Sequence, residues 1–275
     1  MPSPLLLFNE FPQKPEEMTD ELRHQKRVKL EPLIFDSLKQ KYFSQLKKAF
    51  QTYKAPDASE HAIIIIEGRI HPNLEFLIYN AAYFGKGWRI IVCCSDLSRP
   101  WLESVLGSQA SQVEFREVFK GSADREKGRD EYNVLMRSPG FYKSFSQNYL
   151  FFMETDCYIR KVLPIDAWKP YDYIASPASW DESILIGGAS YRRRDAIIQV
   201  CSEYPSETWA HDVFIDEGTR ALSLKRPSFE QALQWFTESC HYEDPVTVHQ
   251  WWTFFFQDCE DAELICSSLL QLDIG

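Results

Sequence analysis

Short apolar runs separated by mixed segments organise the first half of the sequence. Residues 61–66, 88–94 and 150–153 are almost wholly apolar, which is typical of strands buried on both faces of a sheet. Residues 73–84 place apolar side chains on one side at helical spacing, and residues 113–118 form a plausible further strand. Strand, helix and strand in this order predict a βαβ unit, and therefore a parallel sheet with right-handed crossovers.

A long amphipathic helix is predicted over residues 30–53, ahead of the first strand. Apolar residues recur there at every fourth position: Ile34, Leu38, Tyr42, Leu46 and Phe50. The other face carries lysines, which we interpret as a solvated surface. We expect this helix to cover the sheet, with docking of a partner as the alternative. Residues 1 to about 28 are proline-bearing and charged, as in an N-terminal arm.

The second half of the chain mixes irregular and helical patterns. Residues 120–130 and 164–177 are expected to be irregular, the first as a mobile loop, and an apolar run with a double glycine spans 183–190. Helices are predicted over residues 131–137, 193–204, 211–219, 228–239 and 261–272.

These patterns predict an α/β fold in one Rossmann-like domain, with a mostly parallel central sheet flanked by helices and an N-terminal helical extension. We expect an arm and amphipathic helix over residues 1–58, the main domain over 59–258, and a C-terminal helix packed on it over 259–275.

Composition narrows the class of protein. The 275 residues are 44% hydrophobic and 15% aromatic, enough for a sizeable core. The formal net charge of −10 argues against a nucleic-acid partner, because phosphate backbones are bound by basic surfaces. Seven cysteines without metal-finger spacing indicate reduced thiols in a cytosol-like compartment. No apolar run reaches the roughly 18 residues of a membrane span, and no secretory signal is evident, so we expect a soluble cytoplasmic protein.

The candidate chemistry begins where the run 150–153 ends, at Glu154, Thr155 and Asp156. Ligands of open α/β sheets bind beyond the carboxyl ends of strands. Two carboxylates there suit a divalent cation, which prefers oxygen ligands. On spacing alone, a strand that ends in a polar turn explains the same residues.

Three further features follow in order: Gly187-Gly188-Ala189-Ser190, Ala210-His211-Asp212, and His249. Each alone is weak. A double glycine is as often a turn, an aspartate commonly starts a helix, and a lone histidine is more often a core or surface residue than a ligand.

Taken together after a βαβ start, these features resemble the GT-A fold of nucleotide-sugar glycosyltransferases. Six blocks are also similar to one compact glycosyltransferase family of bacteria and large DNA (algal) viruses. They are EGRIHPNLEFLIYNAAYFGKGW, EYNVLMRSPGFY, FMETDCYIR, YDYIASPASW, IGGASYRRRD and DPVTVHQWW. The similarity runs from about Ala62 to Trp252 and leaves out the N-terminal helix and the C-terminal tail.

The resemblance implies a role for each matching position. Asp156, Glu154 and His249 would hold Mn²⁺ or Mg²⁺. The residues implied in nucleotide binding are Glu67, Arg69, Tyr132, Asn133 and Thr155. The residues implied in binding the sugar or the acceptor are Gly187, Gly188, Ser190, Trp180 and His211. For Trp180, a packing role is an equal alternative.

Asp212 matches the general base of inverting members, a carboxylate that removes the proton of the attacking hydroxyl. Two positions depart from the family pattern. Glu154 stands where relatives often have Asp or an amide. His249-Gln250-Trp251 lacks the lysine expected beside the diphosphate, which leaves Arg69 or one of Arg192, Arg193 and Arg194 as stand-ins.

The resemblance therefore implies a metal-dependent hexosyl- or pentosyltransferase that moves a sugar from a nucleotide-diphosphate donor, with UDP-sugar favoured, to a glycan acceptor hydroxyl. Two alternatives stay open. A nucleotidyltransferase also places metal-binding carboxylates after a strand, but it normally needs a glycine-rich loop where this chain has EGRIHPN. A non-catalytic nucleotide- or sugar-binding scaffold would explain the two departures.

Overall fold

The computed structural model describes the chain except residues 1–7, 9, 13, 122–124 and 257–261. A six-stranded sheet, in the order β3-β2-β1-β4-β7-β6, forms its centre. The strands are β1 (His61–Ile66), β2 (Arg89–Ser95), β3 (Glu114–Phe119), β4 (Tyr149–Met153), β6 (Tyr173–Ala178) and β7 (Asp181–Arg193). β1 to β4 are parallel, and β7 is antiparallel to both β4 and β6. The predicted α/β fold with a mostly parallel sheet is confirmed.

Helices connect the parallel strands. α2 (Leu74–Phe84) joins β1 to β2, α3 (Ser98–Leu106) leads through a 3₁₀ helix (Gly107–Gln112) to β3, and α4 (Arg125–Met136) and α5 (Pro139–Lys143) precede β4. Because the chain passes from β1 outward to β3 and returns to the other side of β1, the β1–β4 boundary is a topological switch point. At such a boundary the connections leave a crevice beyond the carboxyl ends of the two strands.

Alternate residues of β1 and β4 serve two separate apolar cores, as the pleat of a strand requires. Ile63, Ile65 and Phe151 pack with α1 and α2 on one face, whereas Ile64 and Phe152 belong to the cluster on the other face. That second cluster includes side chains of α5, α7 (Arg194–Glu203) and α8 (His211–Ala221). Both faces of the sheet are therefore covered, which explains the unbroken apolar runs in the sequence.

A second, three-stranded sheet packs against β6 and β7 of the main one. It has the order β5-β9-β8, formed by β5 (Cys157–Ile159), β9 (Thr247–His249) and β8 (Phe236–Thr237). β5 and β9 are antiparallel, and Cys157 is the partner of His249. This small sheet brings the segment after β4 against residues almost a hundred positions later.

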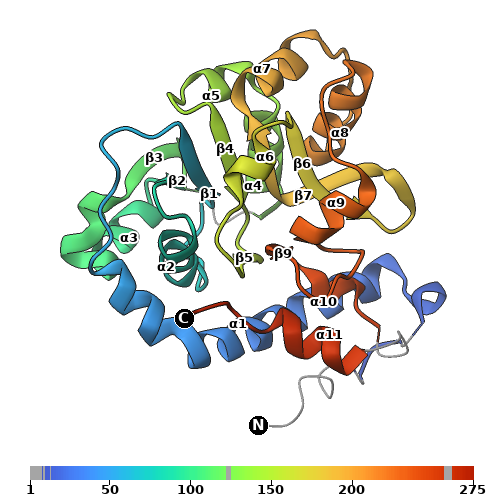
Figure 1. Ribbon diagram of the computed structural model, residues 1–275, viewed down its shortest axis with the longest axis horizontal. Coiled ribbons are helices and arrows are strands. Elements are labelled where there is room, and N and C mark those ends of the chain that lie inside the picture. Colours follow the sequence, from blue (N-terminus) through green and yellow to red (C-terminus); the bar gives the residue numbers. More distant parts are fainter. Residues whose placement is uncertain (1–7, 9, 13, 122–124, 257–261) are drawn as a thin grey trace.

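Helix α1 (Asp20–Phe50) runs along one side of the molecule, next to α2 and α10 (Trp251–Phe254), with α11 (Ala262–Leu269) near it in Figure 1. It begins about ten residues before the predicted start. The Thr19 side chain caps it by accepting a hydrogen bond from the Leu22 amide (3.2 Å). Its buried apolar side chains join the same core cluster as the sheet. The division into residues 1–58, 59–258 and 259–275 stays a prediction.

Three expected segments differ from the structure. Residues 125–130 belong to α4 instead of a loop, and 122–124 lie outside the described residues. The stretch 164–177 holds α6 (Ile165–Trp168) and most of β6. β6 is an edge strand, where Pro177 costs no ladder hydrogen bond. The proline made this segment look irregular in the sequence, so the strand was not predicted. The helix expected over 228–239 is α9 (Phe229–Trp235), which ends where β8 begins.

Within the described residues, no helix has the length and apolar character needed to cross a membrane. The six described cysteines are free thiols, and Cys259 lies outside the described residues.

Candidate metal and nucleotide site

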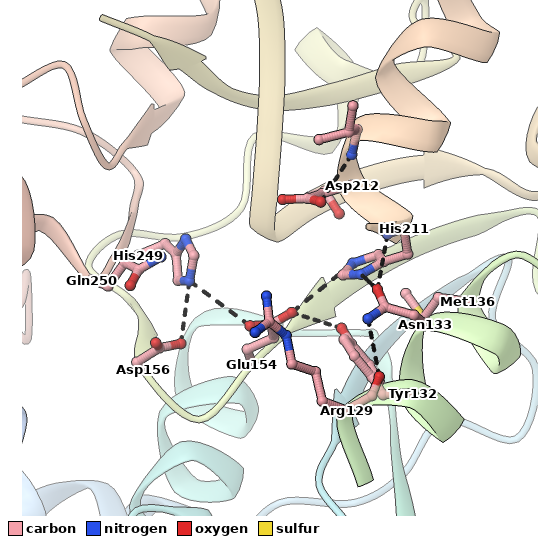
Figure 2. Close-up of polar contacts among 12 residues, drawn as sticks. Arg129, Tyr132, Asn133, Met136, Glu154, Asp156, His211, Asp212, His249 and Gln250 are labelled. Atoms are coloured by element: carbon pink, nitrogen blue, oxygen red, sulfur yellow. Dashed lines mark hydrogen bonds and ion pairs between the residues drawn. The ribbon is translucent and has the colours of Figure 1, made fainter. Parts of the chain in front are cut away.

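A cavity of about 600 Å³ opens beyond the carboxyl ends of β1 and β4, at the switch point of the sheet. Its walls come from the segments after β1 and β4, from α4, from the start of α8, from the end of β9 and from α1. The predicted site residues that line it are Glu67, Arg69, Tyr132, Asn133, Glu154, Thr155, Asp156, Gly188, His211, Asp212 and His249. Figure 2 shows the side chains of Glu154, Asp156, His211 and His249 pointing toward one another.

The turn after β4 fixes the two carboxylates. The Glu154 amide donates to the Gly188 carbonyl (3.0 Å), and the Cys157 amide donates to the Glu154 carbonyl (3.2 Å). Asp156 is only 2% exposed, and its Oδ2 accepts a hydrogen bond from Arg27 Nη2 (2.8 Å). Glu154 Oε1 accepts from the Tyr132 hydroxyl (2.7 Å).

His249 reaches the carboxylates because β9 pairs with β5. The Gln250 amide donates to the Asp156 carbonyl (3.0 Å), which locks the two segments together. His249 Nε2 then lies 3.2 Å from Asp156 Oδ1 and 3.9 Å from Glu154 Oε2 (Figure 2). Gln250 has φ +28°, a strained value for a residue with a side chain, and such strain is common at functional sites.

Glu238, at the end of β8, orients the imidazole from behind. Its Oε2 lies 2.9 Å from His249 Nδ1, and its Oε1 accepts from Gln250 Nε2 (3.0 Å). A carboxylate on the far nitrogen of a histidine fixes the ring and makes the near nitrogen a better metal ligand. Glu238 is buried, so this arrangement is part of the core.

Gly188 lets β7 pass directly behind His249. A Cβ at this position would lie 2.3 Å from His249 Nε2, closer than real contacts allow. Gly187 is restricted in a different way, since a Cβ there would meet the Ala189 carbonyl oxygen at 2.8 Å. The double glycine therefore serves close packing of the strand, and at Gly188 it makes room for the imidazole.

The charges of the site are strongly coupled. Burial alone would raise the pKa of Asp156, but Arg27 and His249 outweigh it and hold that pKa well below the ordinary value. Burial raises the pKa of Glu154, and the Asp156 carboxylate raises it further. Burial opposes a charge on His249, yet Glu238 and Asp156 raise its pKa well above the ordinary value. The Asp156 carboxylate and the His249 imidazole are thus held as an ion pair.

The donor atoms fit a divalent cation. Asp156 Oδ1 and His249 Nε2 are both buried, and neither forms a well-aligned hydrogen bond within the described part of the chain. Their separation of 3.2 Å matches the roughly 3 Å between neighbouring donors around an octahedral ion with bonds of about 2.1 Å. Cys157 Sγ belongs to the same cluster, whose three donor atoms all lie within 4.8 Å of one another. Carboxylate oxygen suits Mn²⁺ and Mg²⁺, whereas imidazole and thiolate suit Zn²⁺, so the donor set fits a divalent cation without selecting one.

Helix α4 positions the start of α8. Asn133 Oδ1 accepts from the His211 amide (2.9 Å) and lies 3.1 Å from His211 Nδ1. Burial lowers the pKa of His211 to about 4, so its imidazole is neutral at physiological pH. Its Nε2 points at Glu154 Oε1 from 4.0 Å and forms no hydrogen bond among the described residues.

Asp212 lies in the first turn of α8, on the opposite wall from His249 (Figure 2). Its Oδ1 accepts a hydrogen bond from the Val213 amide (2.9 Å). The side chain is partly exposed and lines the cavity. A carboxylate in this position can accept a proton from a group bound in the cavity.

The segment after β1 forms another wall. Glu67 accepts two hydrogen bonds from the Arg69 guanidinium, at 2.8 Å to Oε1 and 2.5 Å to Oε2. Ser95, at the end of β2, also lines the cavity beside Gly68. Thr155 contributes to the wall, and its carbonyl accepts from Asn73 Nδ2 (3.1 Å).

Three predicted sugar- or acceptor-binding residues do not line the cavity: Gly187, Ser190 and Trp180. Ser190 is buried within the sheet, where its Oγ accepts from Arg192 Nε (3.0 Å). Trp180 is 61% exposed at the tip between β6 and β7. Their roles in binding stay predictions.

The arginine triplet lies at the wrong end of β4 to hold a diphosphate. Arg192 is the register partner of Leu150, near the start of β4, and the arginines do not line the cavity. Arg192 donates to the Tyr142 hydroxyl (2.5 Å), Arg193 pairs with Asp172 (2.7 Å), and Arg194 donates to the Phe145 carbonyl (2.9 Å).

Sequence reasoning missed three cavity residues of interest: Arg27, Glu238 and Trp209. Arg27 falls in residues 1–28, which were predicted as an N-terminal arm, and its contact with Asp156 spans 129 positions. Glu238 falls in a segment predicted as helix. Trp209 is 43% exposed. The one sequence feature that could have indicated it is its place directly before the Ala210-His211-Asp212 motif.

Comparisons with known proteins give a family match and distant structural similarities. A family model described as "Protein of unknown function (DUF5672)" matches residues 117–249, just under half of the chain. No curated protein matches the sequence. The matched region contains Glu154, Asp156, Asp212, Glu238 and His249, but it contains neither β1 nor α1.

Several solved structures are similar to this chain at low identity. The apo-form glycosyltransferase GlyE of Streptococcus pneumoniae TIGR4 has a TM-score of 0.46 and 8% identity, over 76% of this chain and 63% of GlyE. A protein described as a nucleotide-diphospho-sugar transferase, from Desulfovibrio desulfuricans G20, has a TM-score of 0.36 and 16% identity, over 62% of this chain and 79% of that one.

Another similar structure is 4-diphosphocytidyl-2C-methyl-D-erythritol synthase from Anaerococcus prevotii DSM 20548. Its TM-score is 0.38 at 13% identity, over 61% of this chain and 88% of the synthase. All three TM-scores lie below 0.5, so the function has to be argued from the site itself.

Proposed function

We propose that the protein is a metal-dependent glycosyltransferase of GT-A type, which moves a sugar from a nucleotide-diphosphate donor to a hydroxyl of a glycan. The observation that carries the proposal is the meeting of Asp156, Glu154 and His249 at the switch point of the sheet, with Asp212 on the facing wall of the same cavity. A cavity of about 600 Å³ is within the range of small-molecule sites. UDP-sugar is the favoured donor, by resemblance to metal-dependent relatives.

Asp156 and His249 would hold Mn²⁺ or Mg²⁺, and Glu154 lies close enough to hold it directly or through water. When bound, the metal neutralises charge that builds on the leaving diphosphate. Glu238, 2.9 Å from His249 Nδ1, would hold the imidazole in the orientation that leaves Nε2 available to the metal. His249 has to lose its proton to bind a metal, so metal binding releases a proton from the Asp156–His249 ion pair.

Asp212 would act as the general base of an inverting reaction. The acceptor hydroxyl attacks the anomeric carbon from the face opposite the leaving diphosphate, and Asp212 Oδ takes its proton as the new bond forms. Neutral His211 and Tyr132 line the cavity between this carboxylate and Glu154. They can orient sugar hydroxyls without adding charge beside the reacting carbon.

The loop after β1 favours glycosyl transfer over nucleotidyl transfer. It contains one glycine, Gly68, and its arginine is paired with Glu67, so it does not present the row of free amides and cations that would hold a triphosphate. The free thiols of the described cysteines support a reducing compartment, and we propose a cytosolic site of action.

A thermal-shift screen with a transfer assay tests the function. UDP, GDP and CMP are added with and without Mn²⁺ to the wild type and to Asp156→Ala. A nucleotide at about 100 times its dissociation constant stabilises by roughly 2.7 kcal/mol, a rise of roughly 5–10 °C for a domain of this size. We expect that rise with one nucleotide, and only when both Mn²⁺ and Asp156 are present.

Incubation of the matching nucleotide-sugars with a panel of glycan acceptors, followed by NMR of the anomeric proton, then tests the chemistry. Transfer with inversion supports the proposal. Retention of configuration removes Asp212 as the base. Release of pyrophosphate from a nucleoside triphosphate and a sugar phosphate, in the absence of sugar transfer, identifies a nucleotidyltransferase instead. Nucleotide binding without turnover in either assay points to the scaffold alternative.

A further inference from the structure

The cavity is rich in carboxylates and has few cations that are free to meet a phosphate. Acidic side chains line it from several elements: Glu67, Glu131, Glu154, Asp156, Asp212 and Glu238. A donor that carries a diphosphate brings two or more negative charges into these surroundings. A single divalent ion offsets only part of that repulsion, so the site needs a further cation close to the metal ligands.

Most of the basic residues around the cavity already have another task. The Arg69 guanidinium makes a forked contact with Glu67. The Arg129 guanidinium lies over the Trp209 ring, 4.6 Å from its centroid. Lys120 lines the cavity as an exposed cation, but it follows β3, which β2 and β1 separate from β4 and the carboxylates after it. Gln250, the neutral residue after His249, lines the cavity and donates to Glu238.

Arg27 is the basic residue that reaches the metal ligands. Its Nη2 donates to Asp156 Oδ2 (2.8 Å), while Asp156 Oδ1 faces His249. Within the described residues, this is the one hydrogen bond that its side chain donates, and the side chain is 35% exposed at the cavity wall. A guanidinium has five N–H donors, so Arg27 can keep Asp156 and still offer a fork of donors to phosphate oxygens.

The backbone under Arg27 is held rigidly. The preceding residue, Lys26, is 1% exposed and donates to the Phe255 carbonyl, and its ammonium lies over the rings of Phe8 and Phe256. One turn later, Leu30 and Ile34 are buried in the core shared with the sheet. The position of Arg27 is therefore built into the fold, because a helix outside the βαβ framework is anchored on both sides of it.

We infer that Arg27 is a diphosphate-binding residue of this site, and that helix α1 supplies the phosphate contact that the segment after His249 lacks. The inference rests on the proposed function and deepens it, since it names the group of the donor that α1 recognises. Arg27 would bind the diphosphate while it stays paired with Asp156, so one ion pair joins the proposed metal ligand to the proposed phosphate-binding cation. Helix α1 is then part of the active site and lies outside the region that matches the family model.

Calorimetric titration separates this role from a structural one. The wild type, Arg27→Ala, Arg27→Lys and Arg23→Ala are titrated with Mn²⁺ alone. At saturating Mn²⁺ they are then titrated with UDP, GDP and CDP, and with uridine, guanosine and cytidine as probes without phosphate. Arg23 is the matched control, since it lies one turn earlier on the same helix, pairs with Asp20 and does not line the cavity.

We expect Arg27→Ala to weaken binding of the nucleoside diphosphate that the wild type prefers by about 10- to 100-fold, the usual effect of losing charge-assisted hydrogen bonds. Nucleoside binding and Mn²⁺ binding are retained. Arg27→Lys loses less, because it keeps the charge without the fork. Arg23→Ala binds as the wild type does.

Three results would overturn the inference: unchanged diphosphate binding in Arg27→Ala, an equal loss for nucleosides and diphosphates, or a loss of Mn²⁺ binding, which would mean that Arg27 only positions Asp156. If the wild type binds no nucleoside diphosphate with Mn²⁺, the proposed function fails as well. If Arg27→Ala does not fold, as judged by its melting curve, Arg27→Lys decides alone: wild-type diphosphate affinity would contradict the role, and a selective loss would support it.

Discussion

Two buried aspartates, Asp156 and Asp216, are held in different ways in this molecule. They are 2% and 1% exposed, and arginines contact both. Asp216 Oδ2 accepts from Arg220 Nε (3.0 Å), and its Oδ1 accepts from Arg226 Nη2 (2.6 Å) and from the Leu185 amide (2.8 Å). Asp156 has an arginine on Oδ2, and its Oδ1 faces His249 Nε2 at 3.2 Å.

The difference is in the second oxygen and in what it faces. Asp216 has both oxygens satisfied, and its contacts tie α8 to β7 and to the segment before α9. Asp156 turns its second oxygen toward His249 Nε2, 3.2 Å away, at the wall of a cavity. A carboxylate and an imidazole that meet at a cavity wall can both be reached by a ligand bound there, whereas the contacts of Asp216 lie between elements of the fold. Burial and charge alone would not have separated the two aspartates.

The largest effect on the reaction is expected from Asp212→Asn, on the wall opposite Asp156. The amide keeps the shape of the side chain but cannot accept the hydroxyl proton. We expect kcat to fall by about 10²- to 10⁴-fold, with nucleotide and Mn²⁺ affinities close to those of the wild type. Steady-state kinetics and a Mn²⁺ titration measure both quantities. A kcat within tenfold of the wild type would remove Asp212 from the chemistry.

Asp216→Asn should cost mainly stability. Removing one partner of a buried ionic cluster leaves Arg220 and Arg226 without their counterion, which typically costs about 3–5 kcal/mol. For a chain of this size the melting temperature should fall by roughly 10 °C. Calorimetry measures the melting temperature, and a Mn²⁺ titration at a temperature below the unfolding transition measures metal binding by the folded protein. Loss of Mn²⁺ binding in a folded Asp216→Asn protein would contradict the division between the two aspartates.

Glu238→Gln should weaken the metal site without removing a ligand. Glutamine can still accept the hydrogen bond from Gln250 Nε2, but it loses the carboxylate that lies 2.9 Å from His249 Nδ1. Loss of such an outer partner typically lowers metal affinity by about 10- to 100-fold. Titration of Mn²⁺ monitored by electron paramagnetic resonance gives the dissociation constant. Unchanged affinity would show that Glu238 does not support the histidine.

The smallest effect is expected from Gly188→Ala, compared with Gly128→Ala. The new methyl at 188 would lie 2.3 Å from His249 Nε2, so the ring has to shift, which should cost about 1 kcal/mol, or about fivefold in Mn²⁺ affinity. A Cβ at Gly128, within α4, meets nothing within 4 Å. Gly128→Ala should therefore keep the affinity and stabilise its helix by up to about 1 kcal/mol. Equal Mn²⁺ affinities in the two variants would contradict the close-packing role of Gly188.

The sequence was sufficient for those parts of the molecule whose signals are local. The strands buried on both faces, such as β1 and β4, show as unbroken apolar runs, and the carboxyl end of β4 marks Glu154 and Asp156 directly. Edge strand β6 was missed because Pro177 and small residues interrupt its apolar pattern. Two-residue strand β8 is too short to give any pattern, so Glu238 could not be found from the sequence.

The contacts that complete the site depend on tertiary structure. Arg27 and Asp156 are 129 positions apart, and residues 1–28, predicted as an arm, carry no local pattern that marks an arginine in contact with the site. The pairing of His249 with Asp156 depends on the register of β5 and β9, each three residues long. The order of motifs pointed to His249 through a family resemblance, whereas geometry alone explains how it reaches its partner.

The most direct test of the metal site is a titration with Mn²⁺, monitored by electron paramagnetic resonance, of the wild type, Asp156→Ala and Asp216→Asn. We predict one Mn²⁺ bound per chain in the wild type and in Asp216→Asn, and none in Asp156→Ala at the same concentrations. Mn²⁺ binding of equal affinity in Asp156→Ala, or no bound Mn²⁺ in the wild type, would contradict the assignment of Asp156 and His249 as metal ligands.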